Sequence, residues 1–257
     1  MAPRIFIEVV LLFYVYAFIG WLWETGLYLV KDHKFVARGF LMGPIIPIYG
    51  FGVVSVLYLL RPWFNNLVFL YIAATILVTA LEFITGYGLE KIFHTKWWNY
   101  DKVPLNIGGY VALPVSLFWG VACVFIVEVV QPRVMILVDW AGNRFGILLP
   151  VILIALTSFD FGFTLANLTS FRERMNKLNA VVDERKQKLS KDVGQIKTDW
   201  KAIFKQNPQL PQQVSNLSWG QRHLLNSFPN LKIDNNDTPV QDIKGLSQAL
   251  KQQKQSK

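Results

Sequence analysis

Two glutamates and an arginine stand in apolar surroundings where a charge is costly. Glu24 lies in an apolar run over residues 5–30, and Glu82 lies in another over residues 66–90. Arg38 opens the apolar segment that follows the first run. A charge at membrane depth costs about 2.5–3.5 kcal/mol even on lenient scales, so such groups usually face one another, a cavity or water. We therefore expect a polar site in which Arg38 pairs with Glu24 or Glu82.

The row of side chains that contains Glu82 continues toward the end of its run. Gly86 and Glu90 follow at steps of four residues, which keeps all three on one slowly drifting stripe of a helix. Thr85 precedes Gly86 directly and belongs to the same region. Glu90 is close enough to the helix end to snorkel toward the interface instead. Carboxylates gathered with an arginine can bind a polar ligand or exchange protons with a lipid headgroup.

A polar, aromatic loop over residues 91–108 follows the stripe. Its Trp98 and Tyr100 have two interpretations, because they could cap a cavity or lie in an aromatic belt at the membrane surface. Asn106 ends this loop, and Ser116 lies in the next apolar run. We include all four in the candidate site, and Asp160 in a later run reaches a similar depth.

Other chemistry has little support in the sequence. Cys123 is the single cysteine, and His33, His94 and His223 are scattered without the spacing of metal ligands. We expect no metal and no cofactor. A Walker A motif is absent from the sequence, so any use of ATP requires another chain.

The elements that must position these residues are membrane helices. The chain is 53% hydrophobic and only 17% charged. An α-helix rises about 1.5 Å per residue, so an apolar run of about 20 residues or more can cross the membrane's hydrocarbon core of about 30 Å. The predicted fold is an all-α polytopic membrane bundle over residues 1–170. It has about five transmembrane helices, at residues 5–30, 39–60, 66–90, 109–130 and 146–170. Residues 131–145 are too short to cross and are expected to lie along the interface.

The second of these spans breaks helix rules repeatedly. The segment RGFLMGPIIPIYGFG at residues 38–52 contains glycines and prolines that interrupt or loosen a helix. The helix-break and packing positions are Gly39, Gly43, Pro44, Pro47, Tyr49 and Gly50. A kinked helix over residues 39–60 is the favoured prediction. The alternative is a half-helix with an irregular entry, which must be covered by protein or line a cavity.

Positive charge is concentrated behind the bundle. Residues 172–257 hold sixteen Lys or Arg and eight Asp or Glu, so they carry almost all of the net charge of +9. Residues 171–204 are expected to form a basic amphipathic or coiled-coil-like helix, and residues 205–257 a polar, mostly disordered tail with a short docking element at 216–233. Positive residues favour a cytoplasmic tail and an outer N-terminus. Membrane lipids are expected partners, whereas nucleic acid is not.

Six motifs together resemble a family named as putative ABC-transporter permeases, found mainly in Gram-positive bacteria. They are GWLWET at 20–25, the segment at 38–52, ExxTGxxLExxF at 82–93, WWNYD at 97–101, NIGGY at 106–110 and SLFWG at 116–120. The resemblance covers roughly residues 15–120 and implies a multi-pass protein of the cell membrane. The positions it carries over are Trp21, Glu24, Arg38, Gly43, Pro44, Pro47, Tyr49, Glu82, Thr85, Gly86, Glu90, Trp98, Tyr100, Asn106, Ser116 and Trp119.

Three functions remain open at this stage. The first is a transport component with a cytoplasm-facing polar site, a separate ATPase subunit and a homodimer to supply further spans. The second is a noncatalytic scaffold of the membrane or envelope that recruits partners through the basic tail. The third is an intramembrane enzyme acting on lipid, although no nucleophile–base pair is visible in the sequence. We regard catalysis as the weakest of the three.

Overall fold

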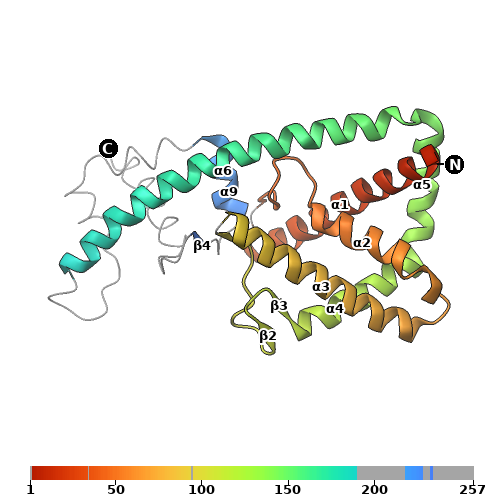
Figure 1. Cartoon of the computed structure of the whole chain (residues 1–257), viewed down its shortest axis with the longest axis horizontal. Coiled ribbons are helices and arrows are strands. Elements are labelled where there is room, and N and C mark those ends of the chain that lie inside the picture. The colour runs from red at the N-terminus through yellow and green to blue at the C-terminus, as the bar shows by residue number, and fades with distance from the viewer. Residues whose placement is uncertain (1, 34, 94, 190–217, 228–231, 234–257) are drawn as a thin grey trace.

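A computed structural model describes residues 2–33, 35–93, 95–189, 218–227 and 232–233, and these are mostly helical (Figure 1). The helices are α1 (Ala2–Asp32), α2 (Pro47–Leu59), the 3-10 turn η1 (Arg61–Trp63), α3 (Leu67–Phe93), α4 (Leu113–Phe125), the π-helical turn η2 (Ile126–Val130), α5 (Gln131–Phe145), α6 (Leu148–Leu189) and α9 (Trp219–Ser227). Four two-residue strands form two small antiparallel sheets. They are β1 (Thr95–Lys96) with β4 (Lys232–Ile233), and β2 (Asn106–Ile107) with β3 (Val111–Ala112).

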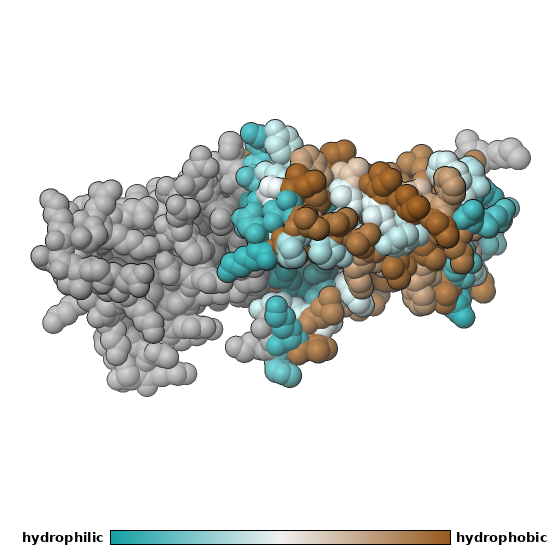
Figure 2. Space-filling view, turned by 90° about the horizontal axis from the view of Figure 1, so that it is seen from below, coloured by the Kyte–Doolittle hydropathy of each residue, from teal (hydrophilic) through white to brown (hydrophobic). Residues whose placement is uncertain are grey.

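The membrane class predicted from composition is confirmed. Within the described residues, four helical stretches are long and apolar enough to cross a membrane: Pro3–Lys31, Leu67–Phe93, Leu113–Phe145 and Leu148–Ser170. Helix α2 is apolar but has only 13 residues. On the face seen in Figure 2, hydrophobic side chains cover the bundle and hydrophilic ones gather at its two ends. This is the surface expected of a protein whose solvent is lipid.

The second predicted span is not a kinked helix. Residues 39–46 are non-helical, and α2 begins only at Pro47. A proline is tolerated at the first helical position because its missing N–H would have no partner there. Gly39 has a backbone φ of +117°, a conformation that residues other than glycine rarely adopt. The half-helix with an irregular entry is therefore what the chain forms.

Helix α4 begins four residues later than the span predicted at 109–130, because the second half of the β2–β3 hairpin occupies the start of that span. The helical stretch that α4 opens continues to Phe145, beyond the predicted end. Turn η2 then joins α4 to α5, and α5 runs across the end of the bundle (Figure 1). Such π-helical turns are common at helix bends. The position of α5 along a membrane interface stays a prediction.

Apolar packing is concentrated at the end of the bundle where α5 crosses. Leu12 and Tyr16 of α1 are buried there together with Val56 of α2 and Leu70 of α3. The Tyr16 hydroxyl donates to the Gln131 side-chain oxygen at 2.5 Å, which ties α1 to α5. Because a Cβ on Gly50 would lie 2.6 Å from the Phe13 ring, only glycine lets α1 and α2 approach so closely here. This end of the bundle is closed by side chains.

Helix α6 extends beyond its apolar part. The helix runs unbroken from Leu148 to Leu189, so the first part of the predicted amphipathic segment continues the last span. The remainder of that segment, residues 190–204, and most of the tail lie outside the described residues. Helix α9 begins with a reciprocal cap, in which the Ser218 N–H donates to the Gln221 side chain at 3.0 Å and the Gln221 N–H donates to Ser218 Oγ at 3.2 Å.

Candidate functional site

A cavity of about 620 Å³ lies at the other end of the bundle, between α1, α2, α3 and α4. The non-helical segment 38–46 and the loop after β1 complete its wall. Most of the lining is aliphatic or aromatic. Its charged side chains are Glu24, Glu82 and Arg38, which sequence analysis had singled out. The volume is within the range of about 300–1,000 Å³ typical of small-molecule sites.

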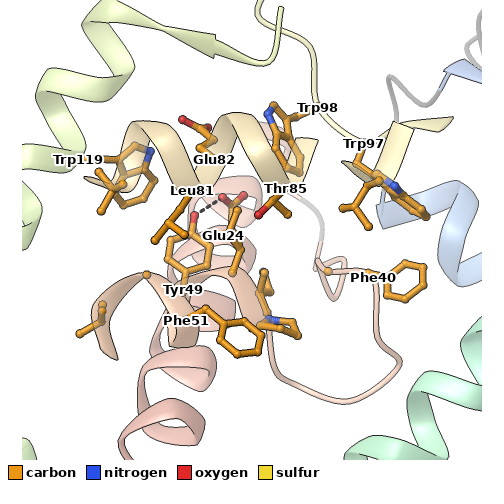
Figure 3. Close-up of a pocket in the computed structure, with 18 of the residues that line it drawn as sticks. Glu24, Phe40, Tyr49, Phe51, Leu81, Glu82, Thr85, Trp97, Trp98 and Trp119 are labelled. Carbon is orange, nitrogen blue, oxygen red and sulfur yellow. Dashed lines mark hydrogen bonds between the residues drawn. The ribbon is translucent and has the colours of Figure 1, made fainter. Parts of the chain in front are cut away.

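Glu24 is held in the cavity by a phenol from the broken second segment. The Tyr49 hydroxyl donates to Glu24 Oε1 at 2.6 Å. Figure 3 shows Glu24 reaching between α1 and α3, with Tyr49 below it and Thr85 beside it. The Tyr49 ring packs edge-on against Trp119 of α4, with ring centroids 5.4 Å apart. Helix α2 thus brings to Glu24 a hydrogen-bond donor that is itself held by an aromatic contact.

Glu82 is matched by a second phenol, which the loop supplies. The Tyr100 hydroxyl donates to Glu82 Oε1 at 3.0 Å. Burial, together with the nearby Glu82 carboxylate, raises the pKa of Tyr100 well above its usual value. Tyr100 therefore stays protonated and remains a donor throughout the physiological range. Glu24 and Glu82 thus bring two carboxyl groups into the wall of one cavity.

The loop that carries Tyr100 is built by its own polar residues. Asn106 donates to the Val103 carbonyl at 2.8 Å and accepts the Gly109 N–H at 3.1 Å. The Trp98 indole N–H donates to the Tyr110 carbonyl at 2.8 Å. A Cβ on Gly86 would lie 2.9 Å from the Trp98 ring, so this glycine lets the indole pack closely against α3. Asn106 shapes the wall and does not line the cavity.

Asp160 anchors the non-helical segment to α6. Its carboxylate accepts the N–H groups of Met42 at 3.0 Å and Gly43 at 2.7 Å, and it also accepts the Thr164 hydroxyl at 3.1 Å. The Ile46 N–H donates to the Ala17 carbonyl at 3.0 Å. Backbone donors at membrane depth need such acceptors because lipid offers none. These contacts explain how an irregular segment persists inside the bundle.

The predicted pairing of Arg38 with Glu24 or Glu82 is not formed. Within the described residues, the arginine has a backbone N–H that donates to Thr25 Oγ1 at 3.2 Å and a guanidinium that bonds the Ser227 carbonyl. The guanidinium also lies 5.2 Å from the centre of the Tyr28 ring. These contacts join the start of the non-helical segment to α1 and α9.

Helix α9 lies against the same segment, beside the cavity. The His223 Nε2 donates to the Leu41 carbonyl at 3.1 Å, and the Ser227 hydroxyl donates to the Ala37 carbonyl at 2.7 Å. The Ser218 hydroxyl donates to Asn167 of α6 at 2.9 Å. Burial lowers the pKa of His223, so the ring is neutral at neutral pH. The tail segment predicted to dock therefore contacts the part of the chain that borders the cavity.

The predicted site residues divide into two groups. Those lining the cavity are Glu24, Arg38, Gly39, Pro47, Tyr49, Glu82, Thr85, Trp98, Tyr100 and Trp119. Those outside its lining are Trp21, Gly43, Pro44, Gly50, Gly86, Glu90, Asn106 and Ser116. Glu90 lies near Tyr110 instead, where burial and the Glu90 carboxylate raise the pKa of the Tyr110 phenol. Whether the first group acts on a ligand stays a prediction.

Sequence analysis missed part of the wall. Phe40, Phe51, Leu81, Cys123 and Phe161 also line the cavity. One part of this wall could have been found from the sequence. Four lining residues recur at three- and four-residue steps and so form one stripe of a helix: Trp119, Ala122 and Cys123 of α4 and Ile126 of η2. No comparable pattern marks Phe40 or Phe161, which reach the cavity from different elements.

Comparison with known proteins gives one family. Residues 11–165 match the family model described as "Putative ABC-transporter type IV". The matched range begins within α1, continues through α5 into the first part of α6, and includes the cavity-lining residues. No curated protein and no solved structure is significantly similar to the chain.

Proposed function

Because the chain belongs to the family of putative type IV ABC transporters, we propose that it is a permease subunit whose ATPase is a separate chain. The chain is a multi-pass membrane protein, and its family indicates a component of membrane transport. The proposal adds a binding site for the transported molecule. That site is the cavity around Glu24 and Glu82.

The observation that carries this proposal is the contrast between the two ends of the bundle. Side chains fill the end near α5, where Leu12, Val56 and Leu70 are buried. At the other end the same helices enclose about 620 Å³ with two carboxylates in its wall. A transporter that exposes its site to one side at a time requires this asymmetry.

The charge of the loops supports a cytoplasmic direction for the cavity. Lys31, Lys91, Lys96 and Lys102 lie at the cavity end of the bundle, as does Arg38. Positively charged residues in short loops favour the cytoplasmic side. We therefore propose that the cavity opens to the cytoplasm and is closed toward the outside.

Thiol labelling tests this direction, because the chain has one cysteine to remove. In a Cys123→Ser background, Thr85→Cys places a thiol in the cavity wall. A membrane-impermeant maleimide should label it in inside-out vesicles and leave it unlabelled in right-side-out vesicles. Ile84→Cys is the matched control, since Ile84 neighbours Thr85 but is 65% exposed on the lipid face of the helix.

The expected rates differ because a thiol reacts as the thiolate, which forms in water and not in lipid. Thr85→Cys should therefore react at least about tenfold faster than Ile84→Cys from the cytoplasmic side. Equal rates for the two variants, or labelling of Thr85→Cys only from the outer side, would contradict a cytoplasm-facing site.

A further inference from the structure

We infer that the cavity binds a hydrophobic organic cation, such as a quaternary ammonium or phosphonium compound. The cationic centre would lie by Glu24 and Glu82, with the organic groups against the apolar wall. The inference rests on the proposed function, because it names the class of ligand that the permease site would take. It depends on the charge, the aromatic lining and the shape of the cavity.

The first argument is charge. Glu24 and Glu82 both line the cavity. Among described residues, Arg38 is the one cation in the lining, and its guanidinium contacts Tyr28 and the Ser227 carbonyl. In surroundings of low dielectric constant, a carboxylate is stabilised in its ionised form by a positive charge close to it. A bound cation supplies that charge, whereas a bound anion opposes it.

The second argument is the kind of contact that the carboxylates offer. Each accepts one phenolic hydrogen bond, from Tyr49 and Tyr100 respectively, which leaves each carboxyl group with further lone pairs. The rest of the lining is mostly aliphatic or aromatic and offers few hydrogen-bonding groups for a polar solute. A cation without N–H donors needs a nearby negative charge rather than a set of directed acceptors. Glu24 and Glu82 are the side chains of the lining that can supply this charge.

The third argument is the aromatic wall. Trp98 and Trp119 lie on two sides of the space in Figure 3, and Tyr49 lies between α2 and Glu24. Trp97 and Phe51 add further rings to the lining. Aromatic faces attract cations and bind quaternary ammonium groups in particular. Leu81 and Ile126 extend the wall with aliphatic surface that suits the organic substituents.

Two ions of the same shape and opposite charge test the inference. Radiolabelled tetraphenylphosphonium and tetraphenylborate are titrated against the full-length protein in nanodiscs, with binding to empty nanodiscs subtracted. The cation should bind at least about tenfold more tightly than the anion. Equal affinity, or tighter binding of tetraphenylborate, would overturn the inference without any variant of the protein.

Substitutions of Glu24 and Glu82 then test whether tetraphenylphosphonium binds in the cavity. Glu24→Gln and Glu82→Gln keep the size of each side chain and should each weaken tetraphenylphosphonium binding about tenfold. Glu8→Gln is the matched control, because Glu8 also accepts a tyrosine hydroxyl, that of Tyr58 at 3.0 Å, but lies outside the cavity. It should leave affinity unchanged. A folded double variant of Glu24 and Glu82 that keeps full affinity would also overturn the inference.

The outcomes separate this inference from the proposed function. If Thr85→Cys is labelled from the cytoplasm but tetraphenylphosphonium neither binds preferentially nor slows the labelling, the ligand class is wrong and the open site stands. If Thr85→Cys is inaccessible from the cytoplasm, the proposed cytoplasm-facing site is wrong, irrespective of how the two ions bind.

Discussion

Three carboxylates at membrane depth find three different partners. Glu24 accepts the hydroxyl of Tyr49, Glu82 accepts that of Tyr100, and Asp160 accepts two backbone N–H groups. Each bond crosses from one element to another. A buried polar group without a partner costs about 1–3 kcal/mol, so these contacts both satisfy the carboxylates and fix the elements that carry the donors.

Asp160→Asn should lower stability by about 1–3 kcal/mol, because the amide keeps one acceptor and turns an N–H group toward a backbone donor. Both carboxylate oxygens are used in the parent, by Met42 and Gly43. Unfolding in mixed micelles of increasing SDS content measures the change. Asp139→Asn on α5 is the control, since Asp139 is exposed and its substitution should change stability by less than about 0.5 kcal/mol. Equal stability of the two variants would mean that Asp160 does not anchor the segment.

The sequence was sufficient to identify these carboxylates but not their partners. A charge inside an apolar run is visible in a single segment, which is why Glu24, Glu82 and Asp160 could be selected. Their donors come from other parts of the chain, and nothing in local spacing brings Tyr100 to Glu82. The contacts described for Arg38 likewise come from other parts of the chain, the Ser227 carbonyl on α9 and the Tyr28 ring on α1.

At the level of elements, the broken second segment also shows that local sequence does not reveal partners from other parts of the chain. Its glycines and prolines correctly marked an irregular stretch, but a kinked helix was the favoured prediction because only a helix satisfies its own backbone in lipid. The structure supplies acceptors from outside, namely Asp160 and the Ala17 carbonyl. These lie on α1 and α6, so the sequence of the segment itself could not indicate them.

Helix α9 should restrict access to the cavity, because it bonds to the carbonyls of Ala37 and Leu41 and so holds the segment that forms the cavity wall. In the Cys123→Ser, Thr85→Cys background, a chain ending at residue 217 loses α9 and β4. Its labelling by maleimide in inside-out vesicles should be several-fold faster than that of the full chain.

A chain ending at residue 233 is the control for this truncation. It keeps α9 and the β1–β4 pairing, and it should label at the rate of the full chain. If the two truncated chains react equally fast, α9 does not limit access to the cavity.

At the scale of the whole molecule, the fold combines a closed end with a hollow end. The helical membrane class could be predicted, since hydrophobic length depends on one segment at a time, although four described stretches rather than five are long enough to cross. The distribution of space could not be predicted, because it depends on which faces meet. Two glycines illustrate this: Gly50 lets α1 approach α2, and Gly86 lets the Trp98 indole approach α3. The family match and this asymmetry point to transport, whereas the basic tail alone would fit a scaffold.

Purification of the tagged chain from its native membrane distinguishes these two functions. A permease should carry with it an ATPase subunit with a Walker A motif, which this chain lacks, and should keep it in a version ending at Leu189. The reason is that the ATPase must act on the helices around the cavity, because ATP hydrolysis drives their conformational change. The shorter chain keeps these helices. A scaffold should instead lose its partners with the tail. Mass spectrometry measures the amount of each co-purified partner relative to the tagged chain in the two samples. An ATPase absent from both would contradict the permease, and partners lost only with the tail would favour the scaffold.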